Sequence, residues 1–305
     1  MRRRTRRKKQ TLKKRRQRGG QKCLYIGLAG GLGNKLFMYA SGLVAQKITG
    51  TSLCITGDLK SPHSSNNYTH LFDGKHTTNG MDSAKEIMTG KLYDKWSKSD
   101  ITYDSSDPSN IKLPPDYYQN YEVVSTIIDD SNKLTAIDVV KNMLLKNEFN
   151  KPKYDSIRQM NLKGSAFMHV RRGDFKTNLL WLLESPYYSQ ALRLLKNIEK
   201  IYICSDEIEW CKENDSLWKQ ATSTPIVYLE GKDELETLYY MILCEAGAII
   251  PNSTFSAWGA MMGADKNPNS VIVYPSPWNP TDGGKPNAFS FPARWKMIER
   301  ATLSK

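Results

Sequence analysis

Residues 167–174 (FMHVRRGD) place two adjacent arginines, a histidine and an aspartate at the end of an apolar run. A guanidinium is always charged, and its planar fork of donors binds phosphate oxygens in pairs. If residues 166–170 form a strand of a parallel sheet, this cluster lies at the edge where such sheets bind ligands. The segment therefore predicts a diphosphate clamp at Arg171 and Arg172. The alternative is an Arg–Asp pair at the surface that closes a turn.

A second polar group, residues 252–254 (NST), lies between the apolar residues 248–250 and a helix predicted over residues 255–262. Hydroxyls in this position cap a helix. The free N–H groups and the positive dipole end of the helix make the same place an anion site. Ser253 and Thr254 are therefore predicted either to cap the helix or to bind phosphate.

Residues 204–207 (CSDE) close another predicted strand at the same edge. A carboxylate there can accept hydrogen bonds from a ribose or a purine, as the acidic residue does in dinucleotide-binding folds. The alternative is that Ser205 or Asp206 caps a following helix. Together, the three strand ends predict one nucleotide-diphosphate site.

The elements that must position these groups begin with an apolar strand over residues 24–28, a turn over residues 29–34 (AGGLGN) and a helix over residues 35–48. Glycines allow the backbone to approach a phosphate closely, although they also mark an ordinary tight turn. Further strands are predicted at 166–170, 201–204, 226–229, 248–250 and 271–274, and helices at 136–145, 186–198, 234–246 and 255–262. Because strands alternate with helix-length segments, the fold class is α/β with a parallel, doubly wound sheet.

The 305-residue chain is long enough for one large domain or two medium ones. Residues 1–22 hold thirteen of the 44 basic residues and no acidic one, and the remaining 31 basic residues equal the 31 acidic ones. The charge of +13 therefore belongs to this tail, which is predicted to be disordered. It can target the nucleus, attach to nucleic acid or an anionic surface, or be a solvated extension. The sequence contains no stretch typical of a signal peptide or a transmembrane helix.

Cysteine and histidine usage gives no sign of a metal site. Cys23, Cys204 and Cys244 fall in apolar runs and are predicted to be buried thiols. An odd count of five cysteines without an export signal predicts a reducing compartment. The four histidines show no paired spacing, so no zinc site is predicted.

From about residue 23 to residue 298 the chain resembles the α-1,2-fucosyltransferases of glycosyltransferase family 11. Five segments carry the resemblance in order: residues 30–37 (GGLGNKLF), 169–174 (HVRRGD), 180–192, 205–211 (SDEIEWC) and 252–259 (NSTFSAWG). The second is shared more loosely with α-1,6- and protein O-fucosyltransferases. Residues 118–121 (YQNY) resemble a segment of the acceptor half.

The resemblance implies a fold of GT-B type, in which two Rossmann-like domains face each other across a cleft. Residues 23–150 would form the acceptor side, and residues 151–305 would bind GDP-β-L-fucose. By this resemblance, Arg171 would bind the β-phosphate, Arg172 would support the charge or the fold, and Asp174 would orient the two arginines. His169 would lie near the nucleoside, and Ser253 and Thr254 would donate hydrogen bonds to the diphosphate. Gly33 and Asn34 would border the phosphate or the fucose.

Several positions depart from the family pattern. Lys35 replaces the usual glutamine, and Ala257 and Trp258 stand in place of a tryptophan pair. Thr237 stands where an acidic residue is usual, and residues 245–246 are Glu-Ala where a basic residue and a histidine are usual. These changes bear on the guanine contacts and the choice of acceptor. They leave the predicted arginine clamp intact.

The implied activity is inverting transfer of fucose to the 2-hydroxyl of a galactose-terminated glycan, with no metal and no cofactor besides the donor. The sequence identifies no general base. The alternatives are a transferase for another nucleotide sugar, an inactive lectin-like relative, and a nucleic-acid-associated protein that acts through its tail. The neutral body shows no basic stripe or RNA-reading motif, which disfavours the last. Without an anchor the chain resembles bacterial or viral family members, so we expect it in the cytoplasm (the host's, if viral), with nuclear targeting by the tail as the alternative.

Overall fold

The computed structural model describes residues 22–62, 67–78, 81–86, 110–113, 115–280 and 291–300. The predicted basic tail up to residue 21, and much of the polar stretch 58–106, lie outside the described residues. Within the described part, no helix combines the length and apolar character that crossing a membrane requires.

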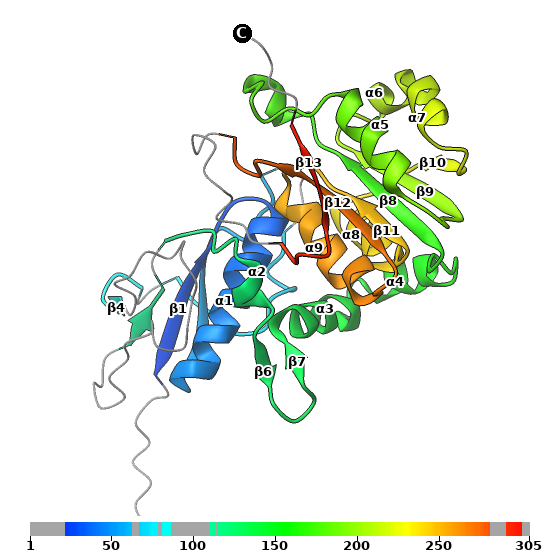
Figure 1. Ribbon diagram of the computed structural model, residues 1–305. Helices are drawn as coiled ribbons and strands as arrows, with labels where there is room; N and C mark the ends of the chain where they lie inside the picture. Colours follow the sequence, from blue (N-terminus) through cyan, green and yellow to red (C-terminus); the bar gives the residue numbers. More distant parts are fainter. Residues whose placement is uncertain are drawn as a thin grey trace, which may run out of the picture.

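A five-stranded sheet forms the N-terminal part of the fold (Figure 1). Its paired strands are all parallel, in the order β3-β2-β1-β5-β4. The strands are β1 (Cys23–Leu28), β2 (Ser52–Gly57), β3 (Lys75–His76), β4 (Lys85–Glu86) and β5 (Ile111–Lys112). Helix α1 (Leu32–Thr49) follows β1 directly, as the strand–glycine–helix pattern predicts, and ends at Gly50 in a left-handed conformation.

Short elements connect this sheet to the next one. They are α2 (Tyr121–Val124), an antiparallel hairpin of β6 (Ile127–Asp129) and β7 (Leu134–Thr135), α3 (Ala136–Lys146) and α4 (Lys151–Arg158). Helix α3 begins with a capping box, in which Thr135 and Asp138 satisfy each other's backbone N–H groups. The predicted domain boundary at residue 150 falls between α3 and α4 and stays a prediction.

A six-stranded parallel sheet carries all three predicted strand-end groups. Its strands are β8 (Ser165–Val170), β9 (Lys200–Ser205), β10 (Ile226–Tyr228), β11 (Gly247–Ile249), β12 (Val271–Ser276) and β13 (Lys296–Glu299), in the order β10-β9-β8-β11-β12-β13. Numbered within this sheet, the order is 3-2-1-4-5-6, the doubly wound arrangement of dinucleotide-binding folds. The direction of winding reverses between β8 and β11, and ligands bind beyond the carboxyl ends of the strands at such a point.

Helices cover both faces of the six-stranded sheet (Figure 1). One face packs against α5 (Ser185–Leu194), α6 (Ile208–Glu213) and α7 (Asp215–Ala221), and the other packs against α8 (Glu234–Leu243) and α9 (Thr254–Met262). Side chains of β8 alternate between the two faces: Met168 and Val170 face α5, whereas Phe167 faces α8 and α9. The short 3-10 helices η1 (Asp174–Thr177) and η2 (Ala264–Lys266) complete this part.

The two sheets share one hydrophobic core. A single buried cluster extends from Leu24 and Ile26 on β1 to Trp258 on α9. Helices α1 and α9 pack against each other (Figure 1). The rings of Phe37 on α1 and Trp258 on α9 lie 4.9 Å apart. The relative position of the sheets is therefore fixed by buried side chains rather than by a linker alone.

The prediction of free, buried thiols is wrong for one of its three cysteines. Cys204 and Cys244 are buried and free, but Cys23 on β1 forms a disulfide with Cys54 on β2. The Cα atoms of this pair are 5.6 Å apart because β1 and β2 are neighbours in the sheet. The odd cysteine count is therefore no argument for a reducing compartment.

We expect iodoacetamide to alkylate three cysteines per chain under denaturing, non-reducing conditions, because three of the five thiols are free. After reduction the count should rise to all five. Intact-mass spectrometry measures both numbers. Five alkylated cysteines before reduction would contradict the disulfide.

Candidate functional site

Arg171 follows β8 at the point where the winding of the sheet reverses. Its Nη2 lies 2.7 Å from Oδ1 of Asp174, and its Nη1 lies 3.0 Å from Oδ2 of Asp206. The Arg171 side chain is 18% exposed, so it is held in place yet open on one side. Two carboxylates thus fix the plane of the guanidinium, which is the orienting role predicted for Asp174.

Asp206 supports the arginine turn (residues 171–174) from the neighbouring strand end. Its Oδ1 accepts a hydrogen bond of 2.9 Å from the backbone N–H of Arg172, and its Oδ2 pairs with Arg171. The predicted alternative, a helix cap, is wrong, because α6 has Glu207 as its N-cap residue and no side-chain cap bond. Both of its oxygens thus support the arginine turn. Binding of the donor by Asp206 stays a prediction.

Arg172 is packed against α6, with a different set of side-chain partners from those of Arg171. Its guanidinium stacks 4.0 Å from the ring centre of Trp210 on α6, and its Nη1 lies 3.2 Å from Oε2 of Glu184. A second carboxylate, Glu207, lies 3.5 Å from its Nε. These contacts hold Arg172 against α6, and its predicted role as a donor ligand stays a prediction.

His169 lies on β8, two residues before Arg171. It is buried, and its ring packs edge-on against Phe255 of α9 at 5.9 Å. Burial, with a further contribution from the charge of Arg171, lowers the pKa of His169 to about 3. The imidazole is therefore neutral at physiological pH. Its Nδ1 has no hydrogen-bond partner among the described residues.

Helix α9 begins at Thr254, and the predicted hydroxyl caps are absent there. Ser253 occupies the N-cap position without a side-chain cap bond. Thr254 instead donates a hydrogen bond of 2.8 Å to Oδ1 of Asn34 on α1. Gln119 donates to the same oxygen at 3.2 Å. Asn34 is therefore held from both sides, at the junction of the two sheets.

Gly33 brings the N-terminus of α1 against that of α9. A Cβ built on Gly33 would lie 2.4 Å from the backbone nitrogen of Phe255, so no larger residue fits without displacing backbone. Trp258 locks the same contact by donating a hydrogen bond of 3.1 Å to the carbonyl of Gly33. The positive ends of two helices thus meet beyond the carboxyl end of β11, the strand next to β8, which favours an anion at this place.

Lys35, the departure from the family glutamine, is buried beneath the glycine turn (residues 30–33). Its Nζ donates hydrogen bonds to the carbonyls of Gly30 and Lys60, the latter at 3.0 Å. Burial lowers the pKa of Lys35, and the charges of Asp58 and Glu234 oppose this effect. The lysine therefore holds the turn from behind.

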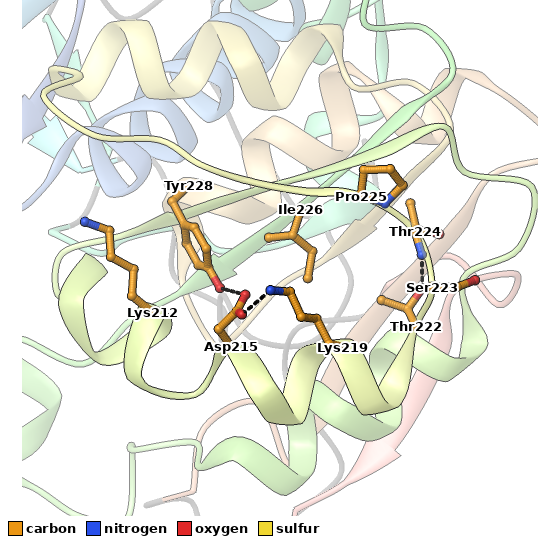
Figure 2. Close-up of a pocket in the computed structure, with 9 residues that line it drawn as sticks. All are labelled: Lys212, Asp215, Lys219, Thr222, Ser223, Thr224, Pro225, Ile226 and Tyr228. Carbon is orange, nitrogen blue, oxygen red and sulfur yellow. Dashed lines mark hydrogen bonds and ion pairs between the residues drawn. The ribbon is translucent and has the colours of Figure 1, made fainter.

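A surface pocket on α6, α7 and β10 lies at the end of the six-stranded sheet farthest from the five-stranded sheet (Figures 1 and 2). Asp215 stands at its centre, where it accepts a hydrogen bond of 2.8 Å from Tyr228 and pairs with Lys219 at 2.6 Å (Figure 2). Lys212, at its rim, is paired with Glu209 and Glu230. None of the predicted site residues lines this pocket, and its charged side chains are paired within the protein.

Sequence reasoning missed several residues that build the site. Gln119, Lys35 and Glu184 each hold a predicted site residue or turn in place. Among the described residues, no cluster of three histidine, cysteine or acidic side chains has metal-binding geometry.

Comparison with protein-family models matches residues 119–279, just over half of the chain, to the model described as "Glycosyl transferase family 11". Two Escherichia coli proteins are similar over most of their length. An alpha-1,2-colitosyltransferase is 27% identical over 90% of this chain and 98% of its own. The O-antigen biosynthesis glycosyltransferase WbnK is 23% identical over 84% and 94%.

Two solved structures share the fold. The fucosyltransferase NodZ from Bradyrhizobium has a TM-score of 0.50 at 13% identity, covering 80% of this chain and 94% of its own. POFUT1, solved in complex with GDP-fucose, has a TM-score of 0.51 at 11% identity, covering 84% and 98%. With the two parallel sheets, these similarities support the predicted α/β fold of GT-B type.

Proposed function

The chain belongs to glycosyl transferase family 11, and from that membership we propose that it transfers L-fucose from GDP-β-L-fucose to the 2-hydroxyl of a galactose-terminated acceptor. The observation that carries the proposal is the geometry of Arg171. Its guanidinium is fixed by Asp174 and Asp206 at the reversal point of the six-stranded sheet, where the neighbouring strand β11 leads into α9. A sugar nucleotide presents a diphosphate, which this arrangement complements.

The proposed mechanism is a single displacement with inversion at C1 of fucose. The bond from C1 to the β-phosphate oxygen breaks, the acceptor oxygen bonds to the opposite face of C1, and the acceptor hydroxyl gives up its proton. Negative charge grows on the departing GDP. Arg171 and the N-terminus of α9 stabilise that charge, and because they are fixed beforehand they stabilise the transition state more than the ground state.

We also propose that transfer needs no divalent metal. In many transferases a bound cation neutralises the leaving diphosphate. Here the permanent charge of Arg171 and two helix N-termini would supply that neutralisation. Asn34 and Gly33 would border the sugar or the phosphate from the side of α1.

GDP-colitose is a second candidate donor, because a colitosyltransferase is similar to this chain over 98% of its own length. Colitose is 3-deoxy-L-fucose, so GDP-colitose carries the same diphosphate and differs by one hydroxyl. A site built to hydrogen-bond a hydroxyl strongly rejects a substrate that lacks it, whereas an apolar pocket barely rejects the extra hydroxyl. The ratio of kcat/KM for the two donors therefore identifies the natural one.

We expect the purified full-length protein to fucosylate lactose with GDP-fucose, to form an α-1,2 linkage, and to keep its rate when EDTA is added. The assay is incubation with GDP-fucose, GDP-colitose, GDP-mannose and UDP-galactose, followed by mass spectrometry and NMR linkage analysis. Transfer from a UDP-sugar alone would contradict the donor assignment. Loss of activity in EDTA that returns with magnesium or manganese would contradict the metal-free mechanism.

A further inference from the structure

The loop before α2 holds an exposed aromatic ring at the junction of the two sheets. Tyr117 is 44% exposed, although it lies between buried elements of the fold. A Cβ built on Gly30 would lie 3.2 Å from Cε1 of Tyr117, so the ring lies directly over the glycine turn. Gly30 has a φ of +73°, a conformation that suits glycine, and its missing side chain leaves room for the ring.

The backbone next to this ring is strained. Tyr118 has a φ of +51°, and such a left-handed conformation is an outlier for a bulky residue that is not glycine. Tyr118 is nevertheless buried, and its carbonyl accepts a hydrogen bond of 2.7 Å from the N–H of Asn120. Strain of this kind persists only where the surrounding structure enforces it, and it concentrates at functional sites.

The loop is tied to the proposed donor site on its other side. Gln119 donates to Asn34, and Asn34 also accepts from Thr254 at the start of α9. Asp116 accepts a hydrogen bond of 2.6 Å from the backbone N–H of Tyr117. The exposed ring of Tyr117 therefore lies two residues before Gln119, which contacts Asn34.

We propose that Tyr117 is the stacking platform for the acceptor sugar, which rests on its ring by the apolar face of a pyranose. This inference deepens the proposed function and rests on it. An aromatic ring offers a flat apolar surface with few rotatable bonds, so it orders a sugar at little entropic cost. A galactoside presents such a face of C–H groups, and stacking leaves its ring hydroxyls free to approach the donor.

The test distinguishes the contribution of the Tyr117 ring from that of its hydroxyl, and an effect on acceptor binding from an effect on donor binding. In Y117A, KM for lactose should rise about tenfold or more, because an aromatic contact is lost. KM for GDP-fucose and the rate of GDP-fucose hydrolysis without acceptor should stay unchanged. Y117F keeps the ring and should stay within about twofold of wild type. F149A removes another exposed aromatic ring, on the segment between α3 and α4, and should match wild type in both KM values.

A binding measurement keeps the inference apart from the donor assignment. Saturation-transfer NMR of lactose with the GDP-loaded protein needs no fucose transfer, and the signal should be strong in wild type and Y117F and lost in Y117A. If lactose binds in this way while GDP-fucose gives no product, the proposed donor is wrong and the platform stands. An equal lactose signal in Y117A, no signal in wild type, or a change confined to KM for GDP-fucose overturns the platform.

Discussion

Replacing Arg171 by alanine should lower kcat with GDP-fucose by about 10² to 10³-fold, the usual cost of removing one fixed donor from a developing anion. The guanidinium is oriented by Asp174 and Asp206 before any substrate binds. Its contribution therefore requires little reorganisation during the reaction, and its loss should fall on kcat more than on KM. Steady-state kinetics with saturating lactose measures the effect.

Two further variants distinguish this role from a structural one. R171K keeps the charge but loses the planar fork, so it should recover only part of the lost rate. R193A removes an exposed arginine from the last turn of α5 and should leave kcat unchanged. Because Asp206 loses a partner in R171A, the melting temperature of each variant should be compared with and without GDP. An R171A enzyme that keeps more than about a tenth of the wild-type kcat would refute the clamp.

Replacing Gly33 by alanine adds a single methyl group, and it should nevertheless inactivate the enzyme because it displaces α1 from α9. The new Cβ would meet the backbone of Thr254 and Phe255, which cannot give way as a flexible side chain does. Helices α1 and α9 must then separate. Overpacking of this kind costs about 1–3 kcal/mol of stability, and a displacement of reacting groups by about 1 Å costs roughly 10²-fold in rate.

The matched control is Gly50→Ala, at the other end of the same helix. Gly50 also has a positive φ, so alanine is strained there, but no atom lies within 4 Å of the new Cβ. G50A should therefore lose some thermal stability and keep its kcat, whereas G33A should lose kcat even at temperatures where circular dichroism shows it folded. Equal kcat in G33A and wild type would show that the close contact of α1 with α9 is not needed for transfer.

The elements that the sequence predicted well are those whose signal is local. β8 is an apolar run buried on both faces, and α1, α8 and α9 have apolar residues at helical spacing. Strand β13 was missed because two of its four residues are charged and it becomes a strand only by pairing with β12. The helix predicted over residues 186–198 ends earlier, at Leu194, and Asn197 adopts a left-handed conformation just beyond it.

What the sequence left open depends on which strands are neighbours. β2 was not predicted, so nothing brought Cys54 next to Cys23. The engagement of Asp206 with the arginine turn likewise requires β9 to lie beside β8. The motif residues themselves were found from their chemistry, because charged and hydroxyl side chains at strand ends are few and their order matched the family.

The shared core has a practical consequence for dissecting this enzyme. Cutting the chain near residue 150 would leave Phe37 on one fragment and Trp258 on the other, each with an apolar surface that its own fragment cannot cover. Each fragment expressed alone should therefore expose apolar surface and aggregate. Chimaeras with relatives should fold and be active only when α1 and α9 come from the same parent. Substrate specificity is therefore better changed by exchanging single loops than by exchanging halves of the chain.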